Sequence, residues 1–266
     1  MRYVNLAFVL FVSAILAVPA FAQGTPSSKA TAAINTAVGC KVSNATTIGD
    51  PIMTCKDLFG HTDLEVKDNY VTVMTSTIKV SNSQSLFVSP SLVTGLYTQT
   101  KTSTSTKTTT TTSQTSQAVA EGGVYLRAIV TNLATGQVQA GYPAAICTPD
   151  ILGCQGLNGK YGVTLDSRIQ TLTQSLTDCI VNGLDGTKIG TCDFTLTTDL
   201  ILQTTSAHSY NFIFPSVGVG VYRIDIQAGI NTSAFASGFA TAVGGAAYGL
   251  GSLTIESVRL VHNFDF

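Results

Sequence analysis

Hydrophobic and polar residues alternate with a period of two along much of the chain. Within 193–203 most apolar side chains fall on even positions and polar ones on most odd positions, and the pattern returns in 222–226. Such alternation is typical of β-strands that bury one face. Repeated between short turns, it predicts an all-β antiparallel β-sandwich, jelly-roll-like, of about nine to eleven strands. The side chains predicted to lie in its core are Phe194, Leu196, Leu200, Leu202, Tyr222, Ile224, Ile226, Val258 and Leu260.

A Thr/Ser-rich tract, 94–117, has the same period. Every even position from Thr98 to Thr112 is threonine, in phase with apolar even positions between Leu86 and Leu96. The branched Cβ of threonine suits a pleated strand. The tract is therefore predicted to be the outer part of a β-hairpin that projects from the sandwich. A structureless loop in the same place is the alternative.

The N-terminus has the features of an export signal. Arg2 precedes an apolar run over 3–18, and Ala20 and Ala22 supply the small residues of a cleavage site. This pattern predicts a cleaved signal peptide, 1–22, and a final location outside the cell, on its surface or in the periplasm. The remaining chain is divided into a loop-rich segment with a disulfide, 23–64, and a β-sandwich domain, 65–266. Ser and Ala residues in the loop-rich segment favour a helical turn or two before residue 38.

The charge of the chain limits the classes of partner that it can bind. Without Arg2, 13 of the 14 Lys and Arg side chains remain against 15 acidic ones. No stretch is basic enough to follow a phosphate backbone, which argues against nucleic acid as a partner.

Six cysteines remain after cleavage of the signal, and an even number in an oxidising compartment predicts disulfides. They fall into three couples of sequence neighbours, although six cysteines allow about 15 connectivities. The hypothesis we adopt pairs neighbours, each bridge closing a local loop: Cys40–Cys55, Cys147–Cys154 and Cys179–Cys192.

Motifs that carry chemistry are scarce. No G-x-S-x-G nucleophile motif occurs, and His208 is interpreted as a hydrogen-bonded structural residue. No catalytic residue and no cofactor is predicted. Two oxygen-rich segments could hold a cation, although solvated loops and ordinary turns explain them equally well. The calcium candidates are Asp178, Asn182, Asp185 and Asp193, and a second acidic group contains His61, Asp63, Glu65 and Asp68.

The C-terminal part, 197–261, contains "SAHSYNF", then "GVYRIDIQA", then "SLTIESVRL". This succession resembles a pattern in uncharacterised bacterial exported proteins with a jelly-roll-like β-sandwich. The resemblance implies an exported β-sandwich protein and brings no activity with it.

These observations favour a non-catalytic secreted or cell-surface protein that is adhesive, structural or binding. Its partner would be an unknown protein, a surface glycan or a second copy of the chain. One alternative is an outer-membrane β-barrel, because the chain ends on Phe266 with alternating residues before it. A second alternative is a secreted hydrolase whose site assembles from distant residues.

Overall fold

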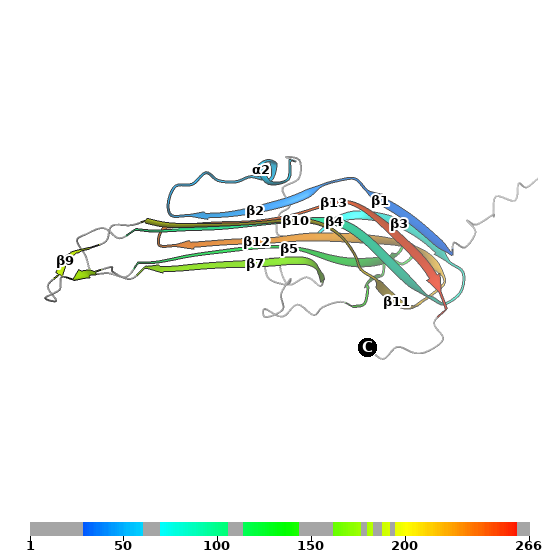
Figure 1. Cartoon of the computed structure of the whole chain (residues 1–266). Helices are drawn as coiled ribbons and strands as arrows, with labels where there is room; N and C mark the ends of the chain where they lie inside the picture. Colours follow the sequence, from blue (N-terminus) through cyan, green and yellow to red (C-terminus); the bar gives the residue numbers. More distant parts are fainter. Residues whose placement is uncertain are drawn as a thin grey trace, which may run out of the picture.

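Two antiparallel sheets, packed face to face, form an elongated sandwich (Figure 1). The computed structural model describes residues 29–60, 70–105, 114–143, 162–176, 180–182, 188–191 and 195–259. Sheet A contains β1 (Ala30–Asn35), β2 (Gly39–Thr46), β4 (Gln84–Ser105), β10 (Thr195–Ser209), β11 (Phe212–Val217) and β13 (Ala240–Val258). Sheet B contains β3 (Val71–Val80), β5 (Gln114–Asn132), β6 (Val138–Ala140), β7 (Val163–Leu176) and β12 (Gly220–Ser237). The described residues also include the short pair β8 (Ile180–Asn182) and β9 (Lys188–Thr191) and the helix α2 (Cys55–Phe59).

The strand order confirms the predicted fold class. Sheet A runs β2-β13-β4-β10, and sheet B runs β3-β12-β5-β7. Among these eight long strands, the first therefore lies beside the last and the second beside the seventh. This is the double Greek-key arrangement of a jelly roll. Neither sheet closes on itself among the described strands, so these strands form the predicted sandwich. None of the helices in the described part of the chain is long and apolar enough to cross a membrane.

The half of the sandwich that contains β3 and β11, called the wide half below, has a hydrophobic core (Figure 1). Alternate residues of β3, β4, β12 and β13 meet there and are fully buried, together with Phe212 and Phe214 of β11. Tyr222, Ile224 and Ile226 belong to this core, which confirms their prediction. This half supplies most of the apolar burial that stabilises the fold.

Strand β10 departs from the predicted buried face. Leu196, Leu200 and Leu202 are 46%, 42% and 43% exposed, so their assignment to the core is wrong. They lie opposite buried threonines of β4, such as Thr100 opposite Leu200, so they do point to the inner side of the sheet. However, β10 is an edge strand, and sheet B leaves its inner face partly uncovered. Alternation shows which side chains share a face, but not whether a second layer covers that face.

The last strand shows a similar difference. Leu253 and Ile255 are fully buried, whereas Val258 has the opposite parity and is only half-buried. The prediction of a buried Val258 therefore chose the wrong face of β13. Phe194 and Leu260, also predicted to lie in the core, are outside the described residues.

The described part of the Thr/Ser-rich tract belongs to the sandwich and not to a projecting hairpin. Strand β4 pairs with β10 and β13 in sheet A, whereas β5 pairs with β12 and β7 in sheet B. The two strands that flank the tract thus face each other across the sandwich instead of pairing as the two arms of a hairpin. Between β4 and β5, residues 106–113 lie outside the described part of the chain. The described threonines on the even face are fully buried: Thr94, Thr98, Thr100, Thr102 and Thr104.

The other half of the sandwich, which holds these threonines, is called the narrow half below. Small side chains let the two sheets approach closely there. Ala118 and Ala120 of β5 pack against Ala240 and Ala242 of β13. At Gly122, an added Cβ would lie 2.5 Å from a carbonyl oxygen of the facing strand β13. The narrow half therefore has no room for the larger side chains of the hydrophobic core.

The N-terminal segment contributes more structure than predicted. Strands β1 and β2 both pair with β13, so residues expected to form loops and a helical turn extend sheet A instead. Their alternation is hidden by small and polar side chains, which carry little hydrophobic signal.

Candidate functional site

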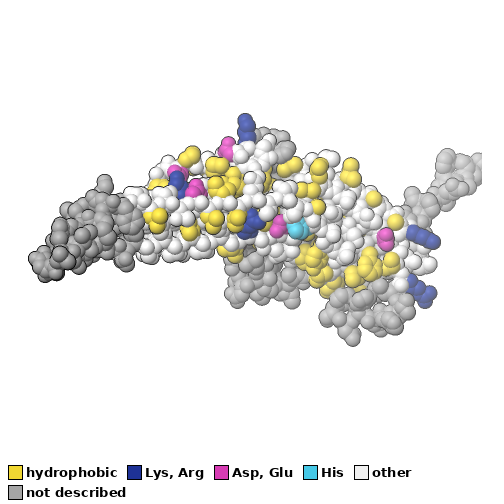
Figure 2. Space-filling model, in the orientation of Figure 1, with side chains coloured by type: hydrophobic (Ala, Val, Ile, Leu, Met, Phe, Trp, Pro, Cys, Tyr) yellow, Lys and Arg dark blue, Asp and Glu magenta, His cyan; other side chains and the backbone are white. Residues whose placement is uncertain are grey.

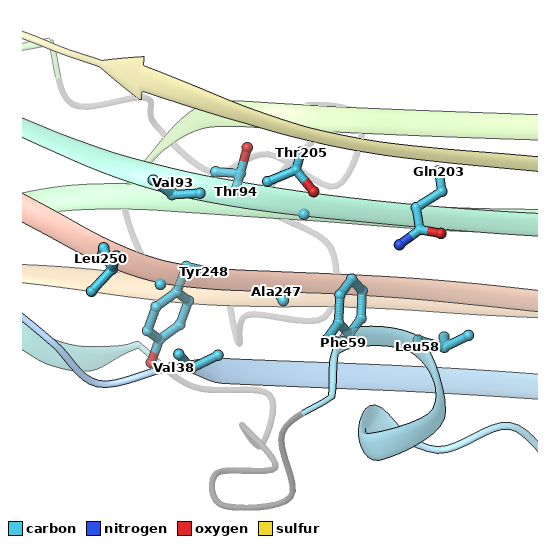
Figure 3. A pocket seen from close by; sticks show the side chains of 12 residues that line it. Val38, Leu58, Phe59, Val93, Thr94, Gln203, Thr205, Ala247, Tyr248 and Leu250 are labelled. Atoms are coloured by element: carbon cyan, nitrogen blue, oxygen red, sulfur yellow. The ribbon is translucent and has the colours of Figure 1, made fainter.

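A hollow of 310 Å³ lies on the outer face of sheet A, between α2 and the edge strand β10 (Figure 3). Its base is formed by β4 and β13. Residues from five parts of the chain line it: Val38, Leu58, Phe59, Val93, Thr94, Gly95, Gln203, Thr205, Ala247, Tyr248, Gly249 and Leu250. We refer to this hollow as the outer groove.

The helix α2 forms one wall and is fixed at its beginning. Thr54 caps the helix and exchanges hydrogen bonds with Asp57. A disulfide joins Cys55 to Cys40 of β2, with 6.1 Å between the Cα atoms, which confirms this predicted pair. Leu58 is buried against the sheet. The wall is therefore preformed, because both a covalent link and a packed side chain hold it.

Small residues make the floor of the outer groove. Gly95, Ala247 and Gly249 lie along it, and the Phe59 ring lies close to Gly95. A Cβ added at Gly95 would be 3.1 Å from the Phe59 ring. Glycine at this position thus lets the half-buried aromatic ring lie close to the sheet.

The groove is uncharged. None of its lining residues is Asp, Glu, Lys, Arg or His. Tyr248 also lines the groove, and burial raises the pKa of its phenol above the usual value, which favours the neutral form. Gln203 and Thr205 of β10 add an amide and a hydroxyl at one side. Such a surface can hold an uncharged, largely apolar group with one or two hydrogen bonds.

A second group of polar side chains bridges the two sheets along the side of the sandwich that is bordered by the edge strands β10 and β7. We call this side the open flank. The Thr94 hydroxyl donates to Asp166 of β7 at 2.7 Å, and Ser206 Oγ lies 2.6 Å from His208 Nε2. Asp166 Oδ2 is 3.4 Å from the same Nε2 atom. Figure 2 shows basic, acidic and histidine side chains gathered in the middle of the visible face. This group contains serine, histidine and aspartate, the three residue types of a common hydrolase site.

The geometry does not match a nucleophilic relay. In such a relay the carboxylate holds one ring nitrogen of histidine while the other faces the serine hydroxyl. Here Ser206 and Asp166 both approach Nε2 of His208. The arrangement instead links β10 and β4 of sheet A to β7 of sheet B. His208 is thus hydrogen-bonded, as its structural interpretation predicts.

The predicted cation sites fall mostly outside the described residues. Asn182 is the last residue of β8, whereas Asp178, Asp185 and Asp193 and the group around His61 are not described. Within the described ranges, no three His, Cys, Asp or Glu residues are grouped closely enough to hold a metal ion. The pairs Cys147–Cys154 and Cys179–Cys192 also involve residues that are not described and stay predictions.

Sequence reasoning missed the outer groove because its residues are spread from Val38 to Leu250. One signal was present. Most residues in 244–251 are glycine or alanine, whereas strands usually carry larger side chains. This indicates a place where another group approaches the backbone.

Comparisons with known proteins leave the chain without an assigned family. No family model matches it. No curated protein matches it either. Among solved structures, the infectious bursal disease virus Gt strain matches 93% of this chain and 49% of its own, at 10% identity and a TM-score of 0.14. The VP2 subviral particle of infectious bursal disease virus matches 91% of this chain and 47% of its own, at 12% identity and a TM-score of 0.13. This chain spans about half the length of those viral chains, and likenesses at such TM-scores carry no argument about its function.

Proposed function

We propose that the protein is a non-catalytic secreted or cell-surface β-sandwich protein that works by binding, with the outer groove as its binding site. The single observation that carries this proposal is the groove itself, which is open, uncharged and preformed. A disulfide beside it, Cys40–Cys55, is consistent with an oxidising compartment.

The lining favours a protein partner that presents an uncharged apolar side chain. Phe59, Val93 and Leu250 offer apolar contacts, and Gln203 and Thr205 supply polar contacts on one side only. Exposed apolar hollows on rigid β-sheets commonly mark sites of protein interaction. The fixed floor and wall lower the entropy cost of binding, because little of the site has to become ordered.

A pair of matched tryptophan variants tests this proposal. Thr205→Trp places an indole in the groove, whereas Thr171→Trp places one on the outer face of β7, in the other sheet and away from the groove. Both threonines are exposed, so the sandwich should tolerate both changes. We expect peptides selected on the mature protein from a displayed random library to bind the Thr171→Trp variant normally and the Thr205→Trp variant at least about tenfold more weakly.

Equal binding to both variants would place the interaction elsewhere and contradict the proposal. Catalysis provides a separate test. Ester, peptide and glycoside substrates are incubated with the mature protein and with its Ser206→Ala variant. Turnover by the unchanged protein that disappears in this variant would refute a non-catalytic function.

A further inference from the structure

Strand β10 has an open hydrogen-bonding edge. It is the last strand of sheet A and pairs with β4 on one side, and no described strand pairs with it on the other. The backbone bonds show which residues face this edge. The amide of Ser103 bonds to Phe239 on the β13 side, so odd residues of β4 bond towards β13 and even ones towards β10. The bond from Tyr210 N to Pro90 O continues the same alternation.

Because the register pairs even residues of β10 with even residues of β4, the odd residues of β10 direct their N–H and C=O groups outward. Within the described part of the chain, no strand pairs with the outward N–H and C=O groups of Asp199, Ile201 and Gln203. This is the pattern that another strand would need in order to extend sheet A.

The side chains of this edge are unusually apolar. Ile201 is 53% exposed on the outer face, and Leu200 and Leu202 are exposed on the inner face. Exposed edges are normally protected by Lys, Pro, bulges or short strands. Strand β10 has 15 residues, contains no Lys, Arg or Pro, and pairs with β4 without a bulge. Figure 2 shows hydrophobic side chains among few charged ones along the narrow half.

We propose that a second copy of this chain covers the edge, with the two β10 strands paired antiparallel about a two-fold axis at Ile201. In this register Ile201 faces its own copy, and Leu200 faces Leu202 of the other copy on the inner side. Asp199 faces Gln203 of the other copy on the outer side. Every contact except the Ile201 pair on the axis occurs twice, as an isologous interface requires.

Charge supports this register. Asp199 accepts hydrogen bonds from Gln99, at 3.0 and 3.1 Å, and its carboxylate has lone pairs left for a further amide. The Gln203 side chain makes no hydrogen bond among the described residues and would supply that amide. The two Asp199 side chains would lie about 13 Å apart along the strands, beyond the Debye length of about 10 Å at ordinary salt. A shift that centres the axis on Asp199 would instead place the two carboxylates face to face.

The area fits a reversible dimer. With the axis at Ile201, residues 195–207 of the two β10 strands pair, over a length of about 43 Å. A strip about 10 Å wide then covers roughly 430 Å² on each copy, and the total of about 860 Å² is typical of a weak, reversible interface. Because the axis is perpendicular to the sheet, both outer grooves would lie on the same face of one continuous sheet. The dimer goes beyond the proposed binding function and does not depend on it.

Light scattering during size-exclusion chromatography of the mature protein tests the association. We expect a dimer that dissociates on dilution. The Ile201→Lys variant should raise the dissociation constant at least about tenfold, because it opposes two charges at the axis. The control is Ile169→Lys on β7, where an isoleucine of similar exposure, 55%, lies on the other sheet. A monomeric unchanged protein, or equal effects of the two variants, would overturn the proposal.

Cysteine variants test the register independently. Paired residues that exchange hydrogen bonds have Cα atoms about 5.5 Å apart, within the range that a disulfide spans. Ile201→Cys should therefore give a reducible covalent dimer on non-reducing gels. Gln203→Cys alone should not, whereas Gln203→Cys combined with Asp199→Cys should. Equal cross-linking of the two single variants, or none in the double variant, would refute the register centred on Ile201.

Discussion

Gln170 holds the narrow half together from β7, and replacing it with leucine should have an unusual result. Its Oε1 accepts from the Thr98 hydroxyl at 2.6 Å. Its Nε2 donates to the Thr100 hydroxyl at 2.8 Å and to the Leu200 carbonyl at 2.9 Å. Gln170 is buried, and both hydroxyls are completely buried. Gln170→Leu keeps a side chain of similar size but removes every one of these bonds.

The expected loss follows from the two hydroxyls that remain. A buried polar group without a partner costs about 1–3 kcal/mol, so two of them should lower the free energy of unfolding by about 2–6 kcal/mol. In contrast, replacing all partners by apolar groups of the same shape is nearly neutral. The triple variant Gln170→Leu, Thr98→Val, Thr100→Val should therefore regain most of the stability that the single variant loses.

Urea unfolding followed by far-UV circular dichroism measures both variants against the unchanged mature protein. Thr98→Val alone serves as a control, because it leaves Gln170 its bond to Thr100. The reasoning is refuted if Gln170→Leu changes stability by less than about 0.5 kcal/mol, the size of an ordinary surface substitution. It is also refuted if the triple variant is no more stable than the single one.

Three further predictions use the same assay. Reducing Cys40–Cys55, which closes a 15-residue separation, should lower stability by about 3 kcal/mol, and an unchanged unfolding midpoint would contradict this. Gly244→Ala should be strongly destabilising because the new Cβ would meet backbone oxygens of the facing sheet, and a stability within about 0.5 kcal/mol of the unchanged protein would show that the sheets can separate there. Ile224→Ala should cost about 2–5 kcal/mol and Leu200→Ala clearly less, because Ile224 is fully buried and Leu200 is 42% exposed; equal losses would mean that Leu200 is covered.

The alternation of side chains predicted the strands well because it is a local property. A β-strand presents every second residue to the same side, whatever it pairs with. In β12, Ile224 and Ile226 are buried as the alternation predicts. The local disulfide Cys40–Cys55 followed from sequence proximity in the same way.

Pairing between distant strands cannot be derived from a period of two, because that period is the same whatever the strand pairs with. Nothing near Leu200 in the sequence indicates that β10 ends a sheet. The threonine tract was placed outside the sandwich because its partners are remote: Gln170 lies 72 positions after Thr98. The outer groove was missed for the same reason, since Phe59 and Gly95 become neighbours only through the fold.

The threonines of β4 also support the proposed pairing of two β10 strands. Thr and Val have nearly the same shape, so a row of valines would fill the narrow half equally well. At this open flank, however, threonine hydroxyls bond to Gln170 and Gln174 of β7, which closes the interior with polar groups. The inner face of β10 differs, because Leu200 and Leu202 are apolar and exposed beside that polar interior. A strand that extends sheet A would cover these leucines while leaving the threonine–glutamine bonds intact, and a second β10 strand meets both conditions.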